Sequence, residues 1–137
     1  MKDGAKILVA YDGSEFAKRA LNEATDLAKK FNGSVTLLHV FWDPEVKKYE
    51  GTEIRDQPTM QLLTDVEKGL KASKIKYEVR SERSDDPPYV ILKMARDEGY
   101  DCIAMGSRGR GGAKALILGS VSSRVVAESA CPVIVVK

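Results

Sequence analysis

The chain has 137 residues, of which 43% are hydrophobic and 31% are charged, which is the balance of an ordinary globular protein. Its formal net charge of +2 is too small to favour nucleic acid or an anionic membrane as a partner. No run approaches the roughly 18 apolar residues of a membrane span, and the first residues do not resemble a signal peptide. We therefore predict a cytoplasmic protein, with residues 1–137 forming a single domain.

Cysteine and histidine are scarce. Cys102 and Cys131 form no CxxC pair, and His39 is the one histidine, so a zinc site is not expected. Both cysteines lie in or beside apolar runs and are predicted to be reduced and largely buried. His39 also lies in an apolar run with no nucleophile beside it, which favours a core histidine over a catalytic base. The sequence thus predicts no metal ligand and no catalytic residue.

The first half of the chain alternates apolar runs with an amphipathic stripe. A continuous apolar run over 6–12 is typical of a strand covered on both faces. Apolar residues then recur at spacings of three and four from Ser14 to Asn32-Gly33, which predicts a helix with a cap and a stop. A second apolar run over 34–41 predicts the next strand. The polar segment 42–57 is predicted to be a loop.

The second half continues the alternation. Pro58 suits the start of a helix, and the segment 75–80 alternates as a strand with one exposed face would. Asp85-Asp86-Pro87 is predicted to open a further helix, rather than to bind a metal, and Gly99 to end it. The remaining elements are a buried strand over 101–106, a helix from Ser120 to Ala130 and a strand over 132–136. The inward residues expected on these three helices are Leu62, Leu63, Val66 and Leu70, then Val90, Ile91, Met94 and Ala95, then Val121, Val125 and Val126.

Strands that alternate with helices indicate parallel pairing through right-handed crossovers. The predicted fold is therefore α/β, a doubly wound five-stranded parallel sheet with helices on both faces. Winding outward on both sides of the first strand gives the order 3-2-1-4-5. Ligands bind such sheets beyond the carboxyl ends of the strands, where the order reverses. That point lies between Asp12, which ends the first strand, and Gly106, which ends the fourth.

The segment that follows the fourth strand is unusually rich in glycine and basic residues: "MGSRGRGGAKALILGSVSS", residues 105–123. Glycines allow backbone amides to approach an anion closely, and Arg108, Arg110 and Lys114 add positive charge. Gly119-Ser120 opens a helix, whose free amides and positive dipole end attract phosphate. The composition of this loop therefore predicts a binding site for an oxyanion. The alternative is a surface loop that binds no ligand.

The aspartate and the serines at this edge of the predicted sheet each have two possible roles. The Asp12 carboxylate can accept hydrogen bonds from ribose hydroxyls or cap the turn before the first helix. The hydroxyls of Ser120 and Ser122 can bind phosphate oxygens or cap their helix.

Two well-known phosphate-binding motifs are absent from the sequence. No glycine starts a Walker A loop, and "DGSEFA" stands after the first strand where a GxGxxG fingerprint would be. What remains is Gly106-x2-Gly109-x9-Gly119-Ser120. This spacing resembles the universal stress protein family in its nucleotide-binding branch, which carries G-x2-G-x9-G-(S/T). The segments "KILVAYDGSEFAKRAL", "LLHV", "AMGSRGRGG" and "CPVIVVK" are similar to the same family, and residues 42–60 are the least similar.

The resemblance implies a Rossmann-like domain of the adenine nucleotide alpha hydrolase kind that binds ATP, with Mg²⁺ carried by the phosphates. It implies that Asp12 holds the ribose and that Ala10 and Val40 flank the adenine. It assigns the sugar-phosphate path and the phosphates to two further sets of residues: Met105, Gly106, Arg108 and Gly109, and Gly119, Ser120, Val121 and Ser122. Arg108 occupies a variable position of the motif, so its role follows from its charge.

The last strand, Pro132–Val136, lies at a sheet edge in the predicted order and carries no charge. Exposed apolar edges invite pairing, so we expect a homodimer in which two copies join about a twofold axis. The family resemblance implies the same dimer.

The sequence is compatible with three functions. The first is a nucleotide-binding regulatory or stress-response protein with little or slow ATP hydrolysis, because one carboxylate near the crevice, Asp12, is too few for a fast hydrolase. The second is a dimeric interaction module of the same fold that binds no nucleotide. The third is an adenylating or pyrophosphatase-type enzyme, for which "YDGSE" is a poor phosphate loop.

Overall fold

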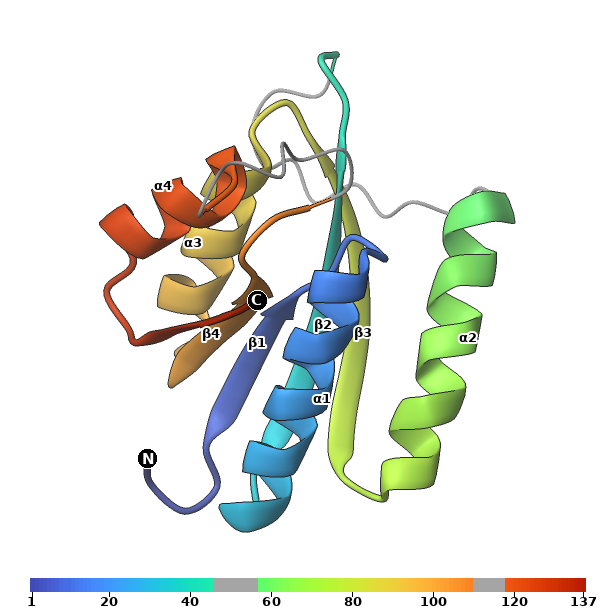
Figure 1. Ribbon diagram of the computed structural model, residues 1–137, viewed down its shortest axis with the longest axis vertical. Helices are drawn as coiled ribbons and strands as arrows, with labels where there is room; N and C mark the ends of the chain where they lie inside the picture. Colours follow the sequence, from blue (N-terminus) through green and yellow to red (C-terminus); the bar gives the residue numbers. More distant parts are fainter. Residues whose placement is uncertain (46–56, 110–117) are drawn as a thin grey trace.

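The computed structural model describes residues 1–45, 57–109 and 118–137 (Figure 1). Most of the segment expected to be a loop before the second helix, and also Arg110 and Lys114, lie outside the described residues. The elements in chain order are β1 Lys6–Ala10, α1 Glu15–Lys30, β2 Ser34–Trp42, α2 Gln57–Ser73, β3 Lys76–Ser84, α3 Pro87–Asp97, β4 Cys102–Gly106, α4 Ser120–Glu128 and β5 Val133–Val136.

The sheet has the predicted topology. Its five strands are ordered β3-β2-β1-β4-β5 and every neighbouring pair is parallel, which confirms the order 3-2-1-4-5. Helices α1 and α2 pack on one face, over a core that includes Ile7 and Val9. Helices α3 and α4 pack on the other face, over a core that includes Leu8 and Ile103 (Figure 1). Successive residues of β1 thus point to opposite faces, and both faces are covered.

Helix α1 shows why the helix predictions hold. The Ser14 Oγ accepts a hydrogen bond from the Ala17 N–H at 3.1 Å and caps the helix. The buried face carries only alanines, Ala17, Ala20, Ala24 and Ala28, so the helix lies close to the sheet. Asn32 has a φ of 51°, a left-handed conformation that ends the helix where the sequence predicted. Gly99, with a φ of 68°, ends α3 in the same way.

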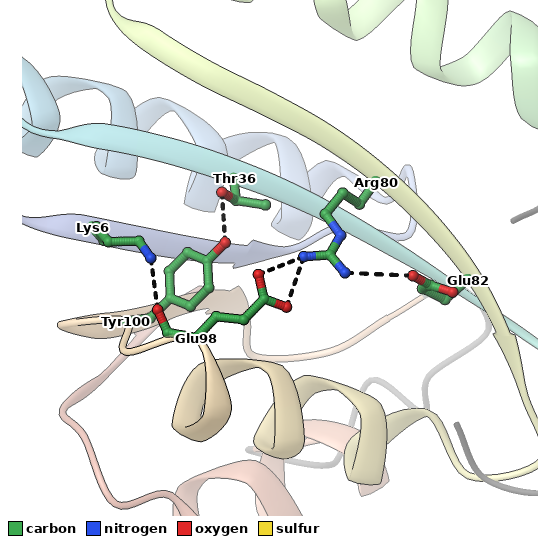
Figure 2. Close-up of polar contacts among 6 residues, drawn as sticks. All are labelled: Lys6, Thr36, Arg80, Glu82, Glu98 and Tyr100. Carbon is green, nitrogen blue, oxygen red and sulfur yellow. Dashed lines mark hydrogen bonds and ion pairs between the residues drawn. The ribbon is translucent and has the colours of Figure 1, made fainter. Parts of the chain in front are cut away.

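Strand β3 is longer than predicted. It continues through four polar residues to Ser84, and Ser81, Glu82 and Ser84 are buried. The extension pairs in parallel with the end of β2, from Ser81 beside His39 to Ser84 beside Trp42, so its partner strand lies elsewhere in the chain. Just before it, the Arg80 guanidinium donates to both carboxylate oxygens of Glu98, at 2.7 and 2.8 Å, and lies 3.7 Å from the Glu82 carboxylate (Figure 2).

The same network continues toward β1. The Tyr100 hydroxyl donates to the Thr36 Oγ1 at 2.8 Å in the buried interior (Figure 2). The Lys6 ammonium lies 4.5 Å from the centre of the Tyr100 ring and donates to the Glu98 carbonyl at 2.6 Å. Burial raises the pKa of the Tyr100 hydroxyl, which therefore stays protonated and keeps this donor at neutral pH.

Two predictions about side-chain placement need correction. Val126, expected to point inward from the last helix, is 43% exposed, because the buried face of α4 is carried by Ser122 and Val125. Cys131, expected to be largely buried, is only partly buried. Cys102 is fully buried, and desolvation raises the pKa of its thiol to about 11. His39 is buried in β2, as expected of a core histidine.

Within the described ranges, none of the helices is long and apolar enough to cross a membrane.

Replacement by alanine should have opposite effects on stability at two glycines, Gly33 and Gly69. A Cβ on Gly33 would lie 2.1 Å from the Ala5 carbonyl oxygen, whereas a Cβ on Gly69, inside α2, would meet no atom within 4 Å. We expect Gly33→Ala to lower the free energy of unfolding by about 1–3 kcal/mol through overpacking. Gly69→Ala should raise it by roughly 0.5–1 kcal/mol, because glycine is a poor helix former. Urea unfolding measures both, and a stable Gly33→Ala variant would contradict the close approach of these two backbone segments.

Candidate functional site: a cleft at the carboxyl edge of the sheet

A cleft opens where β1 and β4 end side by side, with a cavity volume of ≈ 380 Å³. That size suits a small-molecule ligand. All the residues that the sequence predicted for the site line this cleft: Ala10, Asp12, Val40, Met105, Gly106, Arg108, Gly109, Gly119, Ser120, Val121 and Ser122. The structure therefore brings these positions together in one cleft, and their contact with a ligand remains a prediction.

Asp12 follows β1 and is held by the backbone around it. Its Oδ1 accepts a hydrogen bond from the Ser14 N–H at 2.9 Å, so the carboxylate caps the turn that leads into α1. Its Oδ2 lies 2.5 Å from where a Cβ would stand on Gly109. A side chain larger than hydrogen at residue 109 would displace this carboxylate. Capping of the turn therefore occurs, and it fixes the position of the carboxylate in the cleft.

Gly106 permits the close approach of α1 to β4. A Cβ at this position would lie 2.5 Å from the Phe16 Cβ and 2.9 Å from the Phe16 carbonyl carbon. The first turn of α1 is therefore pressed against the end of β4, and Ala17 from that turn joins the cleft wall. Glycine is required here for space, since a larger residue would move the helix.

The N-terminus of α4 forms the opposite wall. Gly119 is the N-cap and its own N–H donates to the Ser107 carbonyl at 2.7 Å. The amides of Ser120, Val121 and Ser122 lie in the first helical turn, where no carbonyl of the helix can accept from them. They line the cleft at the positive end of the helix dipole, which is an arrangement that attracts anions.

The two serines of this turn differ in their surroundings. Ser122 is buried and its hydroxyl donates to the Ser107 carbonyl at 2.7 Å, so this side chain ties the helix to the segment after β4. Ser120 is exposed at the cleft rim. The hydroxyl of Ser120 can reach a ligand, whereas Ser122 offers its backbone amide.

The deep end of the cleft is apolar. Ala10, Val40 and Met105 come from three neighbouring strands, and the structure adds five lining residues that the sequence analysis did not assign: Tyr11, Ala17, Leu38, Pro87 and Ile91. Pro87 and Ile91 come from the start of α3, which follows the carboxyl end of β3 and so reaches the same edge of the sheet. The predicted strand order alone could have placed that helix start beside the cleft.

An ion pair joins the two helices that flank the cleft. The Arg124 guanidinium on α4 donates to the Asp86 carboxylate, at the start of α3, at 2.5 Å. Arg124 also donates to Glu128 at 2.8 Å. Hydrogen bonding to Asp86 first, and to Glu128 second, raises the pKa of Arg124. This side chain therefore ties the start of α3 to the middle of α4.

The cleft has one charge of each sign among its described lining residues, Asp12 and Arg108. Among the residues that the structure describes, no group of three or more histidine, cysteine, aspartate or glutamate side chains could hold a metal ion. The described lining therefore combines an apolar end, one carboxylate, one guanidinium and one helix N-terminus, which suits an elongated ligand with an apolar ring and an anionic tail.

A cleft at the switch point of a 3-2-1-4-5 sheet defines a Rossmann-like α/β protein. Residues 5–137 match the universal stress protein family, and the chain belongs to that family. One relative is the universal stress protein YxiE of Bacillus subtilis, which is 34% identical over 96% of this chain and 98% of its own.

Solved structures share the fold. The structure of the hypothetical protein MJ0577 has a TM-score of 0.77 at 29% identity and covers 96% of this chain and 94% of its own. A universal stress protein in complex with cAMP has a TM-score of 0.75 at 20% identity, over 97% of both chains. A universal stress protein from Archaeoglobus fulgidus in complex with dAMP has a TM-score of 0.71 at 20% identity, over 100% of both chains.

The contrast between the two serines is testable. Ser122→Ala removes a buried hydrogen bond to the Ser107 carbonyl and should lower the free energy of unfolding by about 1 kcal/mol. Ser120→Ala removes an exposed hydroxyl and should change it by less than about 0.5 kcal/mol. Urea unfolding of both variants and of the wild type measures these changes in the free energy of unfolding. Equal losses of stability would contradict the structural role assigned to Ser122.

Proposed function

We propose that this universal stress protein binds an adenine nucleotide, ATP with Mg²⁺, in the cleft between β1 and β4 and acts as a regulatory protein rather than as an efficient ATPase. The observation that carries the proposal is the meeting of Asp12, Gly109 and the N-terminal turn of α4 in one cleft. Relatives of the same fold in complex with cAMP and dAMP support an adenine nucleotide as the ligand class.

The orientation of the nucleotide follows from the polarity of the cleft. The adenine lies at the apolar end between Ala10 and Val40, the ribose hydroxyls donate to the Asp12 carboxylate, and the phosphates lie against the amides of Ser120–Ser122. Arg108 and Gly109 lie between these ends and border the sugar-phosphate path. Met105 and Gly106 close the floor of the cleft.

The Mg²⁺ ion fits this site through the nucleotide. The ion prefers phosphate oxygens and water, with one or two carboxylates at most, and the described lining offers Asp12 and the exposed hydroxyl of Ser120. The ion would neutralise phosphate charge. Fast hydrolysis also requires a positioned water and a group that stabilises the transition state. The described lining residues include one carboxylate, Asp12, and it already accepts from the Ser14 N–H, which supports slow turnover at most.

The nucleotide proposal is tested with Asp12→Asn. Asparagine keeps an oxygen for the Ser14 N–H but loses the charge that strengthens hydrogen bonds from ribose, so we expect MgATP to bind roughly tenfold more weakly. Isothermal titration calorimetry measures the affinity, and an unchanged urea midpoint shows that α1 still starts correctly. A wild-type chain that gives no binding heat in millimolar MgATP, and releases no nucleotide on denaturation, would leave the interaction module as the better description.

We further propose a homodimer that pairs at β5. This strand is the sheet edge in a single copy, and its four residues are all partly exposed. The Pro132 carbonyl accepts from Ile103 in β4 and the Val136 carbonyl from Ser107 just after β4, so the alternate residue Val135 directs its peptide groups to the open edge. Residues 1–137 as a single domain and the cytoplasm as its location stay predictions of the sequence.

Val135→Pro is the matching test, because proline removes the outward N–H and is tolerated on edge strands. We expect sedimentation velocity to show a dimer for the wild type and a monomer for the variant at the same concentration. A wild type that sediments as a monomer would contradict the proposed dimer, and a variant that stays dimeric would move the interface away from β5.

A further inference from the structure

An aromatic ring lies directly beneath the guanidinium of the cleft. The Arg108 Cζ lies 4.7 Å from the centre of the Phe16 ring, within the range of a cation–π contact. Phe16 belongs to the first turn of α1 and is not among the residues that line the cleft, whereas Arg108 is. The ring therefore does not border a ligand directly, and its contact with Arg108 connects it to the cleft.

The backbone and Cβ from which the Phe16 ring projects are held in place. The Phe16 Cβ and carbonyl carbon lie so close to Gly106 that a Cβ on Gly106 would approach them to 2.5 and 2.9 Å. Ala17, the next residue, donates its N–H to the cap residue Ser14 and is buried against the sheet. The ring thus projects from a turn that β4 and the helix cap both hold.

Stacking leaves the donors of the guanidinium in place. The N–H groups of arginine lie in the plane of the group, while the ring contacts its face, so one arginine can stack and donate at the same time. Stacking also removes rotational freedom from a long side chain before a ligand arrives. Both effects favour binding of an anion at the edge of Arg108.

We propose that Phe16 is a positioning residue for phosphate recognition, which holds the Arg108 guanidinium at the cleft so that the site prefers phosphorylated nucleosides over the free nucleoside. This inference rests on the proposed nucleotide function and adds to it a source of ligand selectivity.

A second arginine provides a matched control. The Arg19 Cζ lies 5.5 Å from the centre of the same ring, but Arg19 is exposed and does not line the cleft. Arg19→Gln removes an equal charge from the same ring without changing the lining. If Phe16 acts through Arg108, this control should leave the selectivity unchanged.

The experiment compares MgATP with adenosine by calorimetry on six proteins: wild type, Phe16→Leu, Phe16→Tyr, Arg108→Gln, the double variant Phe16→Leu/Arg108→Gln and the control Arg19→Gln. We expect Phe16→Leu to weaken MgATP roughly two- to fivefold and to leave adenosine unchanged. Phe16→Tyr should retain wild-type affinity, because it keeps the ring. The double variant should bind MgATP no more weakly than Arg108→Gln alone, because the ring acts through that arginine.

Each other outcome overturns a stated part of the account. Equal losses for MgATP and adenosine would mean that Phe16 shapes the cleft and does not position a charge. Wild-type affinity in Phe16→Leu, or additive losses in the double variant, would overturn the role of the ring. Should Phe16→Leu fail to fold, Phe16→Met replaces it with an apolar side chain that has no ring. A wild type that binds neither ligand overturns the proposed function and this inference with it.

Discussion

The cleft exists because β1 and β4 are neighbours while the chain leaves them toward opposite faces of the sheet. After β1 the chain turns into α1, which covers one face, and after β4 it leads to α4, which covers the other. Divergent connections above two adjacent parallel strands leave a crevice that side chains of the sheet cannot fill. The glycines meet this constraint: Gly106 lets α1 approach β4, and Gly109 leaves space for the carboxylate of Asp12.

The polar groups of the cleft are held by the same local contacts that begin the helices. Asp12 accepts from the turn before α1, and Ser122 ties the first turn of α4 to the Ser107 carbonyl. Between them Arg108 stacks on Phe16. A carboxylate, a guanidinium and a set of free amides are therefore positioned before any ligand binds. This lowers the entropic cost of binding. Because contacts at the starts of the helices hold these polar groups in place, a small cleft can select among ligands.

The sequence predicted the architecture because its signals were local. Apolar runs, the alanine stripe of α1 and the stops at Asn32 and Gly99 depend on near neighbours, and the structure reproduces them. The extension of β3 to Ser84 was not predictable, because its polar residues pair with the end of β2, which is distant in the chain. In the site, motif spacing located the glycines and the start of α4, whereas Pro87 and Ile91 enter the cleft through the packing of α3, which no motif records.

The most direct measurement is the change in backbone amide chemical shifts when ATP and Mg²⁺ are added to isotopically labelled protein. We predict the largest shifts at the amides of Ser120, Val121 and Ser122, with a second group at Ala10 and Asp12. Shifts that are absent at millimolar nucleotide, or that gather on a surface away from the start of α4, would contradict this prediction.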